Sequence, residues 1–238
     1  MIPVMLRGMA PRLVLVALAG FMFYLLEPSF HQHGPAPAGM EAELGPRGLA
    51  ASLSNLAGLS MLVLLGGFIS TDRRRGYYRL FFAHPVNPLA FYGLRWALGL
   101  GLALLAALVF LVGGQIAAWG ELRGGWSGLG LALLSAVVYG GVIAFLSALL
   151  PRGDAWVAIV LFMFNYFWLY ALGLGVEPFA APIRQVITFL LPPQTALQDV
   201  YQGLISGQPE WGAAAFSAGY GLFWLVAAAL LLRLREWP

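Results

Sequence analysis

Cysteine and lysine are both absent from this chain of 238 residues, and charged residues make up only 10 % of it. Without cysteine the chain can form no disulfide, thiolate metal site or cysteine nucleophile. Without lysine it can form neither a Schiff base nor the Gly-x-x-x-x-Gly-Lys-Ser/Thr loop with which many ATPases hold phosphate. All 13 basic residues are therefore arginine, and any ATP that drives this protein must be bound by another polypeptide.

The scarcity of charge accompanies 61 % hydrophobic residues and a mean hydropathy of +0.82. An ordinary soluble domain carries about 25 % charged residues and 45–50 % apolar ones. A chain with so little charge cannot cover its folded surface in water, so lipid must surround much of it. This excludes a soluble enzyme, a nucleic-acid-binding module and a disordered tail as descriptions of the whole chain.

Six apolar runs are candidates for membrane spans, because a helix that crosses the bilayer needs roughly 20 apolar residues. The first run is short and reaches sufficient length only if Arg12 extends to the lipid head groups. It could instead be a secretory signal, but the nearest cleavage-like site, Ala36-Pro-Ala38, lies well beyond it. The sequence therefore predicts an all-α polytopic membrane protein with one transmembrane domain over 1–238 and spans at about 9–26, 49–70, 96–118, 128–150, 155–176 and 212–232.

Arginine is distributed unequally among the segments that join these spans. If the N-terminus lies inside, the cytoplasmic segments hold 10 arginines and the outer segments hold 3, while acidic residues divide 3 to 7 in the opposite sense. Positive residues are retained on the cytoplasmic side of a membrane. We therefore expect both termini in the cytoplasm and a location in the cell (inner or cytoplasmic) membrane.

The cytoplasmic loop at 71–95 carries the signals of two helices. Thr71 or Asp72 can cap the first helix by accepting a backbone N–H bond. The apolar stripe of this helix has helical spacing and consists of Tyr77, Leu80, Phe81 and His84. Arg74, Arg75 and Arg79 lie off this stripe. A helix of this kind either lies on anionic lipid or docks onto a cytoplasmic partner through aromatic anchors.

Pro85 ends that first helix, because the residue before a proline is disfavoured in helical conformation. Asn87 then caps a second helix with Pro88 at its first position, where the missing N–H is harmless. The pattern predicts an unbroken helix from Pro88 to Ala118. At 1.5 Å per residue it is about 46 Å long, which exceeds the roughly 30 Å hydrocarbon core of a bilayer.

The motif Asp72-Arg73, Gly76, Leu80 and Pro85-Val86 resembles the loop between the second and third spans of type-2 ABC exporter permeases. The six spans, the cytoplasmic termini and the long outer segment before the sixth span resemble that family as well. The resemblance implies two permease halves that act with two separate ATPase subunits, which bind ATP and Mg²⁺. It also implies an ATPase-coupling helix made of Asp72, Arg73, Arg74, Arg75, Gly76, Tyr77, Tyr78, Arg79, Leu80, Phe81, His84 and Pro85.

The outer segment 177–211 contains four prolines, so no single helix crosses it. Ile183, Val186, Ile187 and Leu190 form one apolar stripe, and a second stripe follows the double proline. Thr195 and Gln198 match a capping box, and Gly207 is a candidate terminator. Two short helices that re-enter the outer leaflet fit this pattern, as the family resemblance also implies; a pair that lies on the membrane surface is the alternative.

The five full spans contain no ionisable residue except tyrosine, which disfavours ion-coupled transport. They do hold scattered polar and aromatic residues, and in the resembling family the second and fifth spans line the transport path. An amide in lipid needs a hydrogen-bond partner, so Asn165 should face protein or a cavity. The candidate pathway residues, which suit an amphipathic cargo, are Ser52, Asn55, Phe162, Asn165, Tyr166 and Trp168.

These observations favour a permease subunit of an ATP-driven exporter that catalyses no reaction itself. Its expected partners are two copies of an ATPase subunit, a second permease copy or homologue, and the lipid bilayer, but no nucleic acid. His31 and His33 supply only two ligands, so no metal site is predicted. A membrane scaffold or assembly protein without its own cargo and a passive channel or uniporter are the alternatives. Neither the cargo nor the choice between homodimer and heterodimer follows from the sequence.

Overall fold

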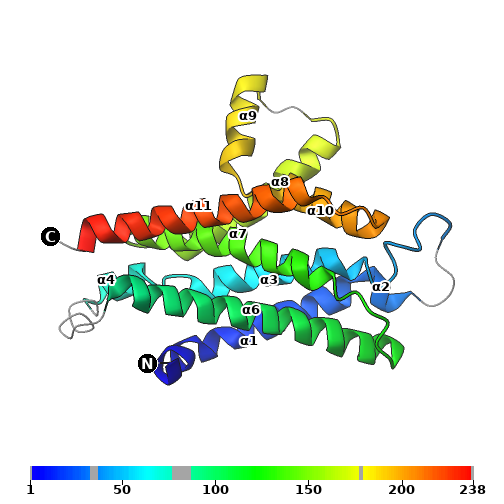
Figure 1. Cartoon of the computed structure of the whole chain (residues 1–238), viewed down its shortest axis with the longest axis horizontal. Helices are drawn as coiled ribbons and strands as arrows, with labels where there is room; N and C mark the ends of the chain where they lie inside the picture. Colours follow the sequence, from blue (N-terminus) through cyan, green and yellow to red (C-terminus); the bar gives the residue numbers. More distant parts are fainter. Residues whose placement is uncertain (1, 33–36, 77–86, 177–178, 237–238) are drawn as a thin grey trace.

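The computed structural model describes residues 2–32, 37–76, 87–176 and 179–236 (Figure 1). These residues form helices and connecting segments, with no strand among them. Six helical stretches are long and apolar enough to cross a membrane, which confirms the predicted multi-pass helical architecture. The long helices are α1 (Ile2–Leu26), α3 (Leu49–Leu65), α6 (Pro88–Trp119), α7 (Gly128–Leu149), α8 (Asp154–Gly173) and α11 (Trp211–Glu236), and the stretch of α3 continues through α4 (Ser70–Arg74).

Helices α3 and α7 form the centre of the bundle. Most of their residues are buried, whereas only a small share of α1, α8 and α11 is buried. Helices α1 and α6 contact α3, while α11, α8 and α10 (Gln194–Ser206) contact α7. In Figure 1 the start of α1, the end of α11 and the whole of α4 lie at the same end of the bundle, here called the α4 end. Helices α2 (Pro28–His31) and α10 lie toward the opposite end, here called the α10 end.

Glycine allows the central helices to approach closely. A Cβ atom on Gly58 of α3 would lie 2.7 Å from the ring of Tyr139, and one on Gly140 of α7 would lie 2.4 Å from Met61. Helices α7 and α11 approach even more closely, because a Cβ on Gly141 would lie 2.1 Å from the carbonyl oxygen of Gly221. Small residues permit such backbone contact in lipid, where packing drives helix association.

Helix α6 is the predicted long, unbroken helix. The Asn87 side chain accepts hydrogen bonds from the N–H groups of Leu89 (2.9 Å) and Ala90 (3.4 Å), and Pro88 occupies the first position. The helix runs for 32 residues and ends at Gly120, whose φ of 73° suits glycine. The cap, the proline and the length all agree with the sequence prediction.

Helix α1 begins at Ile2, several residues before the predicted start, and it includes Pro11. Arg12 was expected to extend to the head groups. In the structure its Nη1 donates a hydrogen bond of 2.6 Å to the carbonyl oxygen of Leu64, near the end of α3. The last carbonyls of a helix lack intrahelical partners, so Arg12 supplies one and attaches α1 to α3.

The segment before α11 contains α9 (Ala181–Leu190) and α10, as the two apolar stripes predicted. Helix α9 projects away from the long helices in Figure 1 and leaves Ile183, Val186 and Leu190 exposed. The predicted capping box is wrong. Helix α10 begins at Gln194, with Pro193 at the N-cap and no side-chain cap bond, so Thr195 is already inside the helix.

Candidate functional site

The chain turns sharply between α3 and α4, directly before the predicted coupling segment. Gly67 has a φ of 74°, a conformation that glycine adopts readily and other residues avoid. The first N–H groups of a helix have no intrahelical acceptor. Ser147 Oγ at the end of α7 accepts from the N–H groups of Ile69 (3.0 Å) and Ser70 (3.1 Å). A side chain from a distant helix thus replaces a local cap.

Asp154, in the first turn of α8, binds the same turn from the other side. Its carboxylate accepts a hydrogen bond of 2.8 Å from the Gly67 N–H and another of 2.8 Å from the Ser70 hydroxyl. The residue is only 3 % exposed. A carboxylate at a helix N-terminus is also stabilised by the helix dipole. Asp154 therefore connects the start of α8 to the junction of α3 and α4.

Arg95 connects α6 to the same junction. Its Nη1 lies 2.9 Å from Asp72 Oδ2 and 2.9 Å from the Phe68 carbonyl oxygen, and both partners accept hydrogen bonds from it. Both charged side chains are mostly buried. On the opposite side of α4, Arg73 donates a bond of 2.8 Å to the Ala148 carbonyl oxygen. We refer to Ser70, Asp72, Arg95, Ser147 and Asp154 as the α4 cluster.

The α4 cluster corrects two details of the predicted coupling helix. The N-cap of α4 is Ile69, and the Asp72 carboxylate bonds to Arg95, so the prediction that Thr71 or Asp72 caps the helix is wrong. Helix α4 ends at Arg74, and Gly76 follows with a φ of 70°. A single uninterrupted helix that starts at Asp72 is therefore also wrong. The other predicted coupling residues, Tyr77, Tyr78, Arg79, Leu80, Phe81, His84 and Pro85, lie outside the described residues.

A polar cleft of about 500 Å³ opens near the α10 end, between α3, α8 and α10. Two predicted pathway residues, Asn55 and Tyr166, line it. The buried Tyr166 hydroxyl lies near the side chains of Asn55 and Gln194 but makes no hydrogen bond within the described residues. Gln194 Oε1 accepts a bond of 3.1 Å from the Tyr139 hydroxyl. The remaining polar residues of the lining are Ser54, Tyr170, Thr195, Gln198, Asp199 and Tyr201.

Charge around the polar cleft is negative. Asp199 is the one formally charged side chain in its lining. Burial raises the pKa of Tyr201 above its ordinary value, and the nearby carboxylates of Glu43 and Glu27 raise this pKa further. Because the surroundings of Tyr201 disfavour its ionised, negatively charged form, they also disfavour other anions at this position.

Three further pathway residues are buried within the chain and connect α8 to its neighbours. Asn165 Nδ2 donates a bond of 3.0 Å to the Pro192 carbonyl oxygen, so this amide faces protein, as expected. Trp168 Nε1 donates to Thr188 Oγ1 at 3.3 Å. The ring of Phe162 packs against Tyr139, with 5.1 Å between centroids. These contacts hold α9 and the segment before α10 against α8, and α8 against α7.

Ser52, the sixth pathway residue, donates its hydroxyl to Glu27. The Glu27 carboxylate also accepts from the Ser29 hydroxyl at 2.7 Å and is 6 % exposed. Sequence reasoning did not find this cluster, and a single Glu after an apolar run gives little indication of it. His31 contacts the Tyr24 carbonyl oxygen, and His33 lies outside the described residues. Within the described parts of the chain, no group of three metal-ligating side chains is found.

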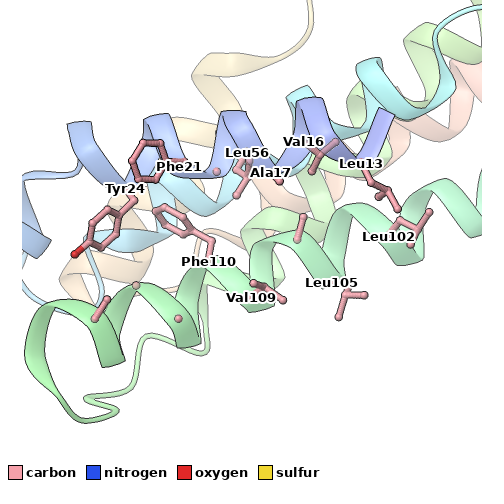
Figure 2. Close-up of a pocket in the computed structure, with 15 residues that line it drawn as sticks. Leu13, Val16, Ala17, Phe21, Tyr24, Leu56, Leu102, Leu105, Val109 and Phe110 are labelled. Carbon is pink, nitrogen blue, oxygen red and sulfur yellow. The ribbon is translucent and has the colours of Figure 1, made fainter. Parts of the chain in front are cut away.

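Figure 2 shows a second cavity, an apolar groove of about 590 Å³ between α1 and α6. Leu13, Val16, Phe21, Val109 and Phe110 are among its lining residues, and Leu56 of α3 contributes to its wall. No charged side chain lines it. The groove therefore offers mainly apolar contact, and the Tyr24 hydroxyl is the one polar side-chain group among its lining residues.

No protein-family model, curated protein or solved structure matches this chain. The resemblance to an exporter family rests on the sequence motif and on the order of the predicted spans.

Proposed function

We propose that this chain is the membrane-spanning permease subunit of an ATP-driven exporter of the ABC class. In this proposal it forms the translocation path, and a separate ATPase subunit binds ATP and Mg²⁺. The α4 end and both termini face the cytoplasm. Two permease halves and two ATPase subunits make up the assembly in the cell membrane, and the exposed aromatic side chains of α8, Trp156, Phe167 and Tyr170, offer contact area for the second permease half.

The observation that carries the proposal is the α4 cluster. Residues 77–86 are preceded by α4, which Ser147 and Asp154 attach to α7 and α8, and are followed by α6, which Arg95 attaches back to α4. A segment that receives force from a partner needs rigid connections to the helices that move. Buried hydrogen bonds to charged groups supply such rigidity.

The polar cleft supports a translocation path at the opposite end of the bundle. It lies between α3 and α8, the second and fifth spans, and it contains polar groups that lipid-facing surfaces lack. Polar residues at membrane depth commonly mark the route of a transported molecule.

The proposal predicts that the tagged chain, purified from its native membranes, brings a nucleotide-binding subunit with it. Replacement of Tyr77, Leu80 and Phe81 together by alanine should lower recovery of that subunit at least tenfold, because apolar anchors dominate interface energies. The matched control replaces Ile183, Val186 and Leu190, which are exposed on α9 away from α4, and should leave recovery unchanged.

Absence of a nucleotide-binding protein from the wild-type preparation would contradict the proposal and favour a scaffold. Flux through liposomes without nucleotide would favour a passive channel. Full recovery with the triple variant would show that the coupling site lies elsewhere.

The orientation is open to a direct test, because the chain contains no cysteine that would need to be removed. Arg74→Cys and Gln208→Cys introduce single thiols at exposed positions at the two ends of the bundle. In right-side-out membrane vesicles, an impermeant maleimide should label the Gln208→Cys protein at once and the Arg74→Cys protein only after permeabilisation. The unmodified chain serves as the blank, and the reverse pattern would invert the topology.

A further inference from the structure

The polar cleft contains side chains that both donate and accept hydrogen bonds. The carboxamides of Asn55, Gln194 and Gln198 each offer an NH₂ group and a carbonyl oxygen, and Ser54 and Thr195 add hydroxyls. Gln194 accepts from Tyr139 through Oε1, so its NH₂ group remains for the cleft side. A ligand hydroxyl is both donor and acceptor, so it matches groups of this kind.

The charges in and around the cleft exclude an anionic ligand. No arginine or histidine is among its lining residues, and the chain has no lysine. The single lining carboxylate, Asp199, lies at an exposed position, whereas Ser54 at the inner wall is buried and uncharged. A phosphate or sulfate would meet no positive partner, and the carboxylates near the cleft lie at its rim (Asp199) or outside its lining (Glu27 and Glu43). The inner part of the cleft therefore suits an uncharged polar group.

The position of the cleft indicates that the ligand is amphipathic. Asn55 is the seventh residue of α3, which places it roughly 9 Å from the helix end at 1.5 Å per residue. This depth lies within a bilayer leaflet, where a purely hydrophilic molecule is poorly placed. The exposed rings of Phe167 and Tyr170 on α8 provide apolar surface beside the cleft. The volume of about 500 Å³ is within the range of small-molecule sites.

We propose that the polar cleft binds the uncharged, hydroxyl-rich head group of an amphipathic ligand, a glycosylated lipid or alkyl glycoside, whose apolar part lies along α8. This inference rests on the proposed transport function, for which it names the substrate class. Its test requires no ATPase subunit, so failure of one proposal can be distinguished from failure of the other.

The test measures lipid retention by native mass spectrometry. The purified chain is reconstituted in nanodiscs that contain equal amounts of digalactosyl diacylglycerol, phosphatidylcholine and phosphatidylglycerol, with free digalactose added in a separate arm. We expect the glycolipid to be retained preferentially and free digalactose not to be retained. Gln198→Leu and Asn55→Leu should each lower glycolipid retention about fivefold, as expected for the loss of one or two hydrogen bonds.

The matched control is Gln202→Leu, the same substitution one turn further along α10 at an exposed position outside the cleft. It should leave retention unchanged. Equal retention of the three lipids, preference for either phospholipid, or equal loss in Gln202→Leu would overturn the proposal. Retention of free digalactose without the lipid would overturn the amphipathic part of it.

Discussion

Replacement of Asp154 by alanine is expected to lower the free energy of unfolding by about 3–6 kcal/mol, because each of two hydrogen bonds to a buried charged group contributes about 1.5–3 kcal/mol. The substitution leaves the Gly67 N–H and the Ser70 hydroxyl without their acceptor. It also removes a carboxylate from the N-terminus of α8. Unfolding in sodium dodecyl sulfate, followed by tryptophan fluorescence, measures the change.

Two control variants separate the hydrogen bonds from the negative charge. Asp154→Asn keeps a carbonyl oxygen for Gly67 and can donate to the Ser70 oxygen, so it should cost less than half as much as the alanine variant. Asp199→Ala removes an exposed carboxylate from α10 and should change stability by less than about 0.5 kcal/mol. If Asp154→Ala unfolded like the wild type, the α4 cluster would not hold the α3–α4 junction.

Replacement of Gly221 by alanine is expected to separate α7 from α11. A Cβ at this position would lie 2.6 Å from the Val137 carbonyl oxygen, and neither backbone can move without disturbing its helix. Overpacking of this kind typically costs 1–3 kcal/mol. We expect about 2–3 kcal/mol by the same unfolding measurement, with lower recovery of folded protein.

Gly219→Ala is the matched control, two residues away on the same helix. No atom lies within 4 Å of a Cβ built on Gly219, and alanine favours a helix by about 1 kcal/mol relative to glycine. The Gly219 variant should therefore be as stable as the wild type or slightly more stable. Equal destabilisation by both substitutions would point to a general effect on α11 instead of close contact with α7.

The features that the sequence predicted well depend on residues close to one another in the chain. Long apolar runs marked the six candidate spans, and Asn87 with Pro88 marked the start of α6, because a cap and the helix that it begins are adjacent in the chain. The exposed and buried sides of α10 likewise followed from residue spacing.

The errors arose where a distant residue or the local backbone replaced the expected cap. At α4 the N–H groups bind Ser147, which is 77 residues away from Ser70, so Thr71 and Asp72 are not needed as caps. At α10 the Leu197 N–H bonds to the Pro193 carbonyl oxygen, and the helix begins before Thr195. The Ser147 partner is distant in sequence and therefore leaves no local pattern at α4.

The candidate site was predicted in part for the same reason. Asn55 and Tyr166 were selected as polar or aromatic residues of the second and fifth spans, and both line the polar cleft. Gln194 and Gln198 belong to the cleft as well, but Gln198 was assigned to a capping box and Gln194 was not singled out. Only the folding of α10 against α3 and α8 brings the carboxamides together.

In the chain, residues 77–86 connect α4 to α6, and these two helices are held in different ways. Helix α4 is held by buried hydrogen bonds to α6, α7 and α8, whereas α6 is one continuous helix of 32 residues with no proline after Pro88. A push applied between them would therefore swing α6 as a single body. A rotation of about 5° around the middle of this helix would carry its far tip through roughly 2 Å, given a length of about 48 Å. Trp119 at that tip touches Phe30, so the displacement would reach the α10 end of the bundle without any intervening hinge.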